Sequence, residues 1–324
     1  MTILGRTGWS MLGVLFLCAG LIVAGLLLWR PDIPYAKLEA KYANAQSRFM
    51  DLPGGLHIHY RDQGRRDGLP VVMIHGYSAS LYAWEPWVAR LGDRYRIVTL
   101  DLPGHGLTRA PDTYAASLDR YADVVDTVTR RLNLGPYVVV GNSMGGGVAW
   151  TLALIHPERL RGLVLVDSVS WPSAAADGGS SLLYKALASP VGLWALKNLD
   201  TRWYAQSNLR AAYVTPSLVT PALIDRYVDL SRAPGHRTIL LNIGPSAGPP
   251  VTAATLGAIK TPTLVMQGEA DPIIPLAVGR ALAAAIPGAK LATYPGVGHV
   301  PMEQIPDRSA RDLRAFLQTV DPAP

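Results

Sequence analysis

Apolar and polar positions change their spacing in a regular way along most of this chain. Short runs of apolar, mostly β-branched residues predict buried strands, and longer stretches with apolar residues at helical spacing predict amphipathic helices. The expected strands are residues 71–74, 95–100, 137–140, 163–166, 263–266 and 291–294. The expected helices are residues 84–91, 117–132, 148–156, 276–285 and 307–317. Strands and helices that alternate in this order predict an α/β fold, with a mostly parallel central sheet flanked by helices on both faces.

Residues 49–63 have the pattern of a β-hairpin that precedes the alternating part of the chain. Its turn falls at the Pro-Gly-Gly of residues 53–55, between two segments of alternating apolar and polar positions. His57 and His59 fall on the polar positions and could bind a metal ion, but no third ligand is evident. We therefore expect them to lie on the solvent-facing side of a strand, and we expect no metal site.

The strand and helix alternation is interrupted between residues 168 and 257, where the apolar spacing is helical throughout. Thr220-Pro221 has the residue types of a helix N-cap and first helical position. An inserted helical cap over one continuous domain explains the interruption best. The expected organisation is an anchor at 1–32, a first core part at 33–167, a cap at 168–257 and a second core part at 258–324.

Residues 9–29 form an uncharged apolar segment that begins and ends with tryptophan. A single helix crosses a bilayer with about 20 apolar residues. Arg6 and Arg30 flank the segment, as is typical at membrane interfaces. A cleaved signal peptide is the alternative, but its apolar part is usually shorter, and no A-x-A-like cleavage site follows. We therefore expect an N-terminal transmembrane helix that contacts membrane lipid, with the side of the membrane left open.

Charge and cysteine content narrow the functional classes only a little. The net charge of +6 comes from scattered Lys and Arg residues without a basic cluster, so we expect no nucleic-acid partner. A mildly basic surface near anionic lipid explains the charge more simply. Cys18 is the single cysteine, which excludes a disulfide framework and a cysteine-based metal site.

The candidate chemistry begins at Ser143, in the sequence Gly141-Asn142-Ser143-Met144-Gly145. A predicted strand ends directly before this motif and a predicted helix begins directly after it, which is the context of a nucleophile elbow. The turn leaves little room for side chains beside the serine, so glycine is expected at positions 141 and 145.

A serine hydroxyl needs a base within hydrogen-bond reach and an acid that orients the base. His299 and Asp271 each follow a predicted strand, at the sheet edge where ligands bind in open α/β folds. Several residues compete for these two roles on sequence grounds alone. The alternatives to the base are His75, His105, His156 and His236, and the alternatives to the acid are Glu269 and Asp167.

These motifs together resemble the α/β-hydrolase superfamily over residues 50 to 320. The resemblance rests on His75-Gly76, the loop at residues 101–106, the elbow, residues 268–271 and Gly298-His299. It implies Ser143 as nucleophile, Asp271 rather than its rivals as acid, and His299 as base.

The resemblance also implies an oxyanion hole made of backbone N–H groups. The two donors would be the N–H groups of Tyr77 and Met144, the residues after His75-Gly76 and after the nucleophile. We expect His75 and His105 to brace loops, and Asp101 to stabilise its own tight turn.

Serine at the elbow disfavours epoxide hydrolysis and dehalogenation, for which the superfamily uses aspartate there. Within the superfamily, the chain is similar to single-span esterases and monoacylglycerol-lipase-like enzymes. We expect a serine carboxylesterase or lipase that acts on a small-molecule or lipid ester without a cofactor. Hydrolysis of carbon–carbon bonds, thioesters or amides, and a non-catalytic binding role, are the alternatives. Apolar cap residues either face the bilayer or pack over the pocket; they are Leu182, Leu183, Leu187, Leu193 and Trp194.

Overall fold

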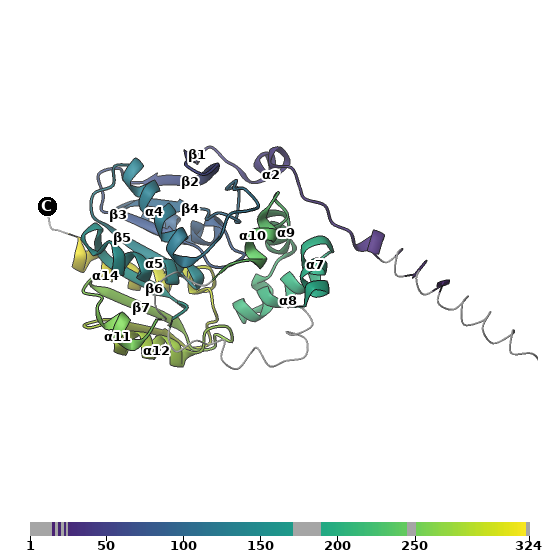
Figure 1. Ribbon diagram of the computed structural model, residues 1–324. Coiled ribbons are helices and arrows are strands. Elements are labelled where there is room, and N and C mark those ends of the chain that lie inside the picture. Colours follow the sequence, from purple (N-terminus) through teal and green to yellow (C-terminus); the bar gives the residue numbers. More distant parts are fainter. Residues whose placement is uncertain are drawn as a thin grey trace, which may run out of the picture.

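The computed structural model describes residues 15–16, 19–20, 23, 25–170, 189–244 and 251–321 (Figure 1). The strands in this part of the chain form one eight-stranded sheet in the order β1-β2-β4-β3-β5-β6-β7-β8. The strands are β1 (Ser47–Leu52), β2 (Leu56–Gly64), β3 (Pro70–Ile74), β4 (Arg96–Leu100), β5 (Tyr137–Asn142), β6 (Leu160–Val166), β7 (Thr263–Gly268) and β8 (Lys290–Tyr294). The β1–β2 and β2–β4 pairs are antiparallel and the other pairs are parallel. The prediction of a mostly parallel sheet after a hairpin is confirmed.

Helices cover both faces of the sheet (Figure 1). The helices of the core are α3 (Glu85–Leu91), α4 (Leu118–Arg131), α5 (Met144–Ile155), α11 (Ala253–Gly257), α12 (Leu276–Ala285), α13 (Pro301–Gln304) and α14 (Pro306–Val320). Successive strand residues point to opposite faces. Val72 and Ile74 therefore pack in the hydrophobic cluster that includes α4, α5 and α12, whereas Val71 and Met73 pack in the cluster that includes α3 and α14.

The cap helices lie between β6 and β7 in the chain. They are α7 (Pro190–Asn198), α8 (Arg202–Tyr213), α9 (Pro221–Ser231) and α10 (His236–Leu241). The predicted helix start at Thr220 is confirmed, because its side chain accepts a hydrogen bond from the Leu223 N–H, 3.2 Å away. The expected cap range extends to residue 257, but α11 packs against α12 instead, since Leu256 is buried with Leu282 of that helix.

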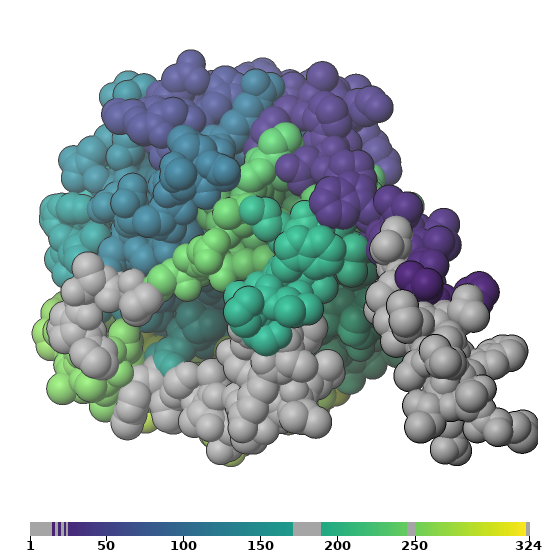
Figure 2. Space-filling view, turned by 45° about the vertical axis from the view of Figure 1, so that its right-hand side comes forward, coloured from purple at the N-terminus to yellow at the C-terminus, as the bar shows by residue number. Residues whose placement is uncertain are grey.

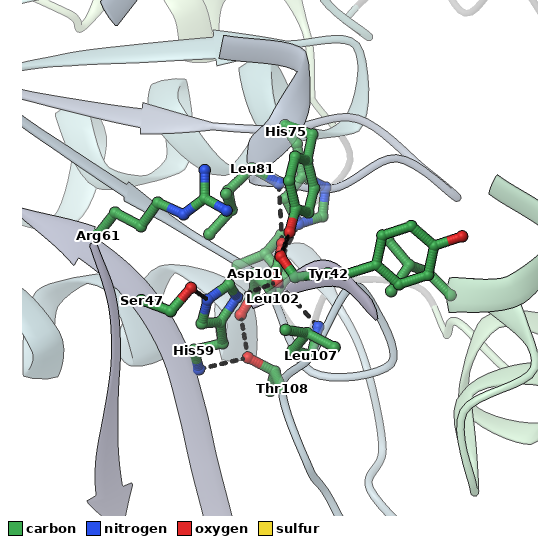
Figure 3. A network of polar contacts seen from close by, with 12 residues as sticks. Tyr42, Ser47, His59, Arg61, His75, Leu81, Asp101, Leu102, Leu107 and Thr108 are labelled. Carbon is green, nitrogen blue, oxygen red and sulfur yellow. Dashed lines mark hydrogen bonds and ion pairs between the residues drawn. The ribbon is translucent and has the colours of Figure 1, made fainter. Parts of the chain in front are cut away.

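The expectation that His59 faces solvent is wrong. Its side chain is fully buried, and both ring nitrogens have partners inside the protein (Figure 3). His59 Nδ1 lies 2.7 Å from Asp101 Oδ2, and His59 Nε2 lies 2.9 Å from Ser47 Oγ. An apolar–polar alternation cannot distinguish a solvent-facing position from one whose polar groups are all satisfied inside the protein. His57, in contrast, is partly exposed, and no group of described residues could hold a metal ion.

The expected transmembrane helix lies mostly outside the described residues, and no helix within them is long and apolar enough to span a membrane. The chain that follows residue 27 is docked on the cap (Figure 2). Backbone hydrogen bonds join Arg30 N to Asn198 O (2.9 Å) and Asp200 N to Leu28 O (2.8 Å). Helix α2 (Tyr35–Tyr42) comes next and buries Leu38. The N-terminal segment is therefore fixed to the cap before the sheet begins.

Candidate active site

Ser143 occupies a sharp turn between β5 and α5. Its φ of 55° and ψ of −119° place a non-glycine residue in a strained backbone region. A Cβ at position 141 would overlap the carbonyl group of Gly145, and one at position 145 would overlap that of Ile74. The prediction that both positions require glycine is confirmed, and the strand-to-helix turn has the form of a nucleophile elbow.

His299 and Asp271 are hydrogen-bonded to each other beside this turn. His299 Nδ1 lies 2.6 Å from Asp271 Oδ2, and both side chains are buried. The other carboxylate oxygen, Asp271 Oδ1, accepts hydrogen bonds from the N–H groups of Ile273 (2.7 Å) and Ile274 (3.1 Å). Since Asp271 is held at both oxygens, it fixes the imidazole ring with Nε2 as the nitrogen that remains available.

Ser143 and His299 line the same cavity, which has a volume of about 450 Å³. Within the described part of the chain the Ser143 hydroxyl makes no hydrogen bond, so rotation about its Cα–Cβ bond breaks none. Hydrogen bonds between catalytic groups are often long in ligand-free structures and shorten when substrate binds. The cavity walls are mostly apolar and come from both core and cap. They include Ala79, Leu196, Ala205, Leu209, Ala212, Leu240, Leu241, Ile273 and Val300.

The predicted oxyanion donors are backbone N–H groups of Met144, which directly follows Ser143, and of Tyr77, which lines the cavity. Met144 is the first residue of α5, so its N–H has no partner within the helix. Tyr77 follows Gly76, whose carbonyl oxygen accepts a hydrogen bond from His75 Nδ1, 2.8 Å away. The C=O and N–H of one trans peptide point in opposite directions. The bond to Gly76 O therefore turns the Tyr77 N–H away from His75.

His75 is a fully buried histidine that braces this loop. Its Nε2 accepts a hydrogen bond from the Leu102 N–H, 3.1 Å away, while its Nδ1 donates to Gly76. Burial lowers the pKa of His75, which favours the neutral ring, and a neutral ring can donate a hydrogen bond from one nitrogen and accept one at the other. The expectation that His75 braces a loop is confirmed.

Asp101 holds the two loops that meet beside His75 (Figure 3). Its carboxylate accepts hydrogen bonds from the N–H groups of Leu81 (2.8 Å) and Leu107 (2.9 Å), as well as from His59. Burial alone would raise the pKa of Asp101, but the bond from His59 and the other partners lower it to about 2. Ser47, His59 and Asp101 form a second serine–histidine–aspartate chain. None of the three lines the cavity, and their arrangement serves the loop structure.

Asp167 and Glu269, the alternatives to Asp271 as the acid, have hydrogen-bond partners other than His299. Asp167 directly follows β6 and accepts a hydrogen bond from Gly268 N at 2.8 Å. Burial and the neighbouring Asp271 carboxylate raise the pKa of Asp167 well above its usual value, which disfavours its charged form. Glu269 is exposed and accepts a hydrogen bond from Thr293 Oγ1.

Among the seven histidines of the chain, all of them in described parts of the structure, His299 lines the cavity and the others do not. His105 Nδ1 lies 3.2 Å from the carbonyl oxygen of Pro103, as expected for a residue that braces its loop. His236 is buried in α10 and contacts the carbonyls of Leu230 and Thr108.

Three features of the site were not predicted from the sequence. Asn142 Nδ2 donates to the carbonyl oxygen of His299 at 3.1 Å and so ties the elbow to the histidine loop. Arg237 of α10 lines the cavity, although no charged group was expected there. The cap also supplies three tyrosines to the cavity wall: Tyr204, Tyr213 and Tyr227. Helical spacing predicts an apolar face in the cap, with Leu223, Tyr227 and Leu230 on one side of a helix, but it does not indicate which side chains reach the cavity.

The chain is similar in sequence to known hydrolases. The chain is 28% identical to the 2-hydroxymuconate semialdehyde hydrolase of Pseudomonas sp. (strain CF600), over 84% of this chain and 94% of that protein. It is 30% identical to the pimeloyl-[acyl-carrier protein] methyl ester esterase of Nitrosomonas europaea, over 78% of this chain and 96% of that protein. A crystal structure described as a membrane phospholipase A, a novel bacterial virulence factor, superimposes with a TM-score of 0.72 at 24% identity, covering 98% of this chain and 100% of its own. A family model described as alpha/beta hydrolase fold matches residues 70–304, and the chain belongs to that family.

Proposed function

We propose that this α/β hydrolase cleaves carboxylic esters through Ser143, His299 and Asp271, with an acyl-enzyme intermediate. The hydrogen bond between His299 Nδ1 and Asp271 Oδ2, at 2.6 Å beside a cavity that also contains Ser143, carries the proposal. A histidine oriented by a buried carboxylate is what an alcohol nucleophile requires at neutral pH.

In the proposed reaction, His299 Nε2 takes the proton of the Ser143 hydroxyl while Oγ attacks the ester carbonyl carbon. The N–H groups of Met144 and Tyr77 donate hydrogen bonds to the carbonyl oxygen and stabilise the negative charge that develops on it. The alcohol leaves with the proton from His299. Water then attacks the acyl-enzyme in the same way and restores the free serine.

The ester preference is argued from the elbow and the cavity. Serine rather than aspartate at the elbow favours acyl transfer over dehalogenation, and a mostly apolar cavity suits an acyl chain. The names of the two relatives span a semialdehyde hydrolase and a methyl ester esterase, so they support hydrolysis without selecting the bond. Carbon–carbon bonds, thioesters and amides are the competing substrates, and a panel with matched acyl groups separates them.

We further propose that residues 9–29 anchor the enzyme in a membrane. The uncharged length of this segment and the flanking Arg6 and Arg30 support the anchor. The likeness to the membrane phospholipase A supports the fold alone at 24% identity. Leu193 and Trp194 of α7 are exposed, which favours the bilayer-facing alternative for them, whereas Leu182, Leu183 and Leu187 lie outside the described residues. Recovery of the full chain in the salt-washed soluble fraction would contradict the anchor.

Substitution of the nucleophile tests the proposal. Ser143→Ala is expected to fold normally and to lose about a thousandfold or more in kcat on a 4-nitrophenyl ester. A fluorophosphonate probe should label the wild type but not this variant. Ser231→Ala is the control, because Ser231 lines the same cavity but bonds within its own helix, and labelling should persist. Unchanged esterase activity in Ser143→Ala would remove Ser143 from the mechanism.

A further inference from the structure

Arg237 brings a positive charge into a cavity wall that is otherwise nearly uncharged. It is the second residue of α10, and it lines the same cavity as Ser143. Of the described residues that line this cavity, Arg237 is the one with a lysine, arginine, aspartate or glutamate side chain. A few polar groups in an apolar pocket usually set the orientation and the specificity of the ligand.

Only some of the hydrogen-bond donors of the Arg237 guanidinium have partners among the described residues. Arg237 Nη2 pairs with Asp32 Oδ1 at 2.7 Å, and the arginine side chain is 12% exposed. Arg237 Nε is buried and makes no hydrogen bond with any described residue. A buried charged donor without an acceptor costs stability. An anion in the cavity would supply the missing acceptor.

A second cavity, of about 220 Å³, shares Arg237 with the first. The two cavities also share the walls formed by α7 and α10, because Leu196 lines the first and the adjacent Lys197 lines the second. The remaining wall of the second cavity is the docked N-terminal segment. It contributes Trp29, Arg30, Pro31 and Asp32.

Positive charge exceeds negative charge around this second cavity. Arg30 pairs with Asp200 at 3.0 Å, but Lys197 has no carboxylate within ion-pair distance in the described part of the chain. Arg232 lies close by and donates two hydrogen bonds to the Pro31 carbonyl. Burial lowers the pKa of Arg232, and the nearby Arg237 and Arg30 lower it further, whereas Asp229 and Asp200 raise it. The cluster could not be predicted from the sequence, because its four cations come from three separate segments. They are Arg30, Lys197, Arg232 and Arg237.

We propose that Arg237 and the adjoining cations form a subsite for an anionic group of the substrate, a carboxylate or a phosphate. The substrate is then an ester that carries a negative charge at the end remote from its reacting carbonyl group. Arginine suits this task because its planar fork binds carboxylate and phosphate oxygens. The inference rests on the proposed ester hydrolysis at Ser143 and adds the chemical class of the ester.

Asp32 competes with the substrate for Arg237 in this arrangement. It belongs to the N-terminal segment that lies against the cap (Figure 2), and its side chain is 45% exposed. Removal of its charge should therefore leave Arg237 more available to an anionic substrate. This gives the subsite two variants with opposite expected effects.

Mono-4-nitrophenyl esters of dicarboxylic acids, from succinate to sebacate, test the subsite in the full-length protein. Each is compared with its methyl ester, which has the same chain and no charge. The wild type should prefer the anionic member by about tenfold in kcat/KM. The preference should peak at one chain length, because the carboxylate must reach Arg237 while the carbonyl lies at Ser143.

Arg237→Gln should reduce kcat/KM on the anionic ester about tenfold more than on the neutral ester. Arg237→Lys should retain part of the preference for the anionic ester. Asp32→Asn should increase this preference. Arg311→Gln removes an exposed arginine of α14 and should change neither ester. Equal losses on both esters in Arg237→Gln would overturn the subsite and leave ester hydrolysis intact. Equal losses on both esters together with a lower Tm would indicate a purely structural role for Arg237, in which it binds Asp32 and fixes the N-terminal segment.

A binding measurement separates the subsite from catalysis. Octyl phosphate, nonanoate and octanol are titrated into Ser143→Ala by calorimetry, which requires no turnover. Tighter binding of octyl phosphate identifies a phosphate as the preferred group, and tighter binding of nonanoate identifies a carboxylate. The preference for the anion over octanol should be lost in the double variant that combines Ser143→Ala and Arg237→Gln. Binding of octanol as tight as that of both anions would contradict the proposal, even if no ester were hydrolysed.

Discussion

The backbone N–H of His299 donates a hydrogen bond to the carbonyl oxygen of Ala212, 2.7 Å away. Ala212 belongs to α8 of the cap, so a cap helix is bonded directly to the residue that we propose as the catalytic base. The approach depends on Gly298, since a Cβ at that position would overlap the Ala212 carbonyl. The position of the cap and the position of the histidine are therefore not independent.

Gly298→Ala should disrupt this junction. The added methyl group forces α8 away from the histidine loop, and overpacking of this kind costs about 1–3 kcal/mol of stability. Displacement of a catalytic group by about 1 Å can cost a hundredfold in rate, so kcat should fall by at least about tenfold. Gly135→Ala is the matched control, because a Cβ there meets nothing within 4 Å. Wild-type kcat in Gly298→Ala would show that the cap does not position His299.

The two neighbouring aspartates should respond differently to loss of charge. Asp271→Asn is expected to lower kcat about a thousandfold or more, because asparagine favours the wrong tautomer of His299. Asp167→Asn should cost less than about tenfold, since the raised pKa of Asp167 already disfavours the charge that asparagine removes. Measurement of kcat at pH 7.5 for both variants makes the comparison. The reverse order of losses would assign the acid to Asp167.

His75 should act as a positioning residue for the oxyanion donor. His75→Phe removes one of the two hydrogen bonds to Gly76 O, leaves the one from the Ala79 N–H at 3.2 Å, and so loosens the peptide that carries the Tyr77 N–H. Because the oxyanion develops only in the transition state, kcat should fall about tenfold to a hundredfold, with KM changed less. His75→Asn retains a short side-chain donor and should recover part of the rate. A rise in KM at constant kcat would exclude this role.

The sheet and the elbow could be predicted from the sequence because they depend on local patterns. The apolar run at residues 137–140 and the two glycines that flank Ser143 specify a strand and a sharp turn without reference to the rest of the chain. Asp271 and His299 could be placed at one sheet edge because parallel strands bring their carboxyl ends together. The pair does meet in the structure, at 2.6 Å.

The contents of the cavity could not be predicted in the same way. Arg237, Tyr213 and Tyr227 come from cap helices whose packing on the core depends on distant contacts, such as the one between Ala212 and His299. His59 was misplaced for a related reason: its partner Asp101 lies 42 residues away in the chain. Alternation within one strand contains no information about such a partner.

Glu303 of α13 gives the cap contact a pH dependence that can be measured. Burial raises the pKa of Glu303 to about 7, although the nearby Arg226 of α9, 3.8 Å away, acts in the opposite direction. Tyr213 and Tyr227 of the cap and Glu85 of α3 are the other titratable groups that face it.

The sign of the effect follows from the direction of this shift. The folded state binds the Glu303 proton more tightly than the unfolded state, where the pKa is 4.5. The stabilisation is therefore complete below pH 4.5 and is lost as the pH rises through 7. Glu303→Gln keeps the shape of the side chain without the charge, so it should raise the Tm relative to wild type more at pH 8 than at pH 5. The difference should be on the order of 1–3 kcal/mol in unfolding free energy.

Thermal unfolding of both proteins between pH 5 and pH 8 gives the comparison, with Glu269→Gln as the control. Glu269 is exposed and accepts a hydrogen bond from the Thr293 hydroxyl, which does not titrate, so its substitution should not change the pH profile of the Tm. A Glu303→Gln profile parallel to that of the wild type would mean that Glu303 stays ionised in the folded protein. In that case the Arg226 guanidinium compensates for burial, and the cap contact is a buried ion pair rather than a proton-binding site.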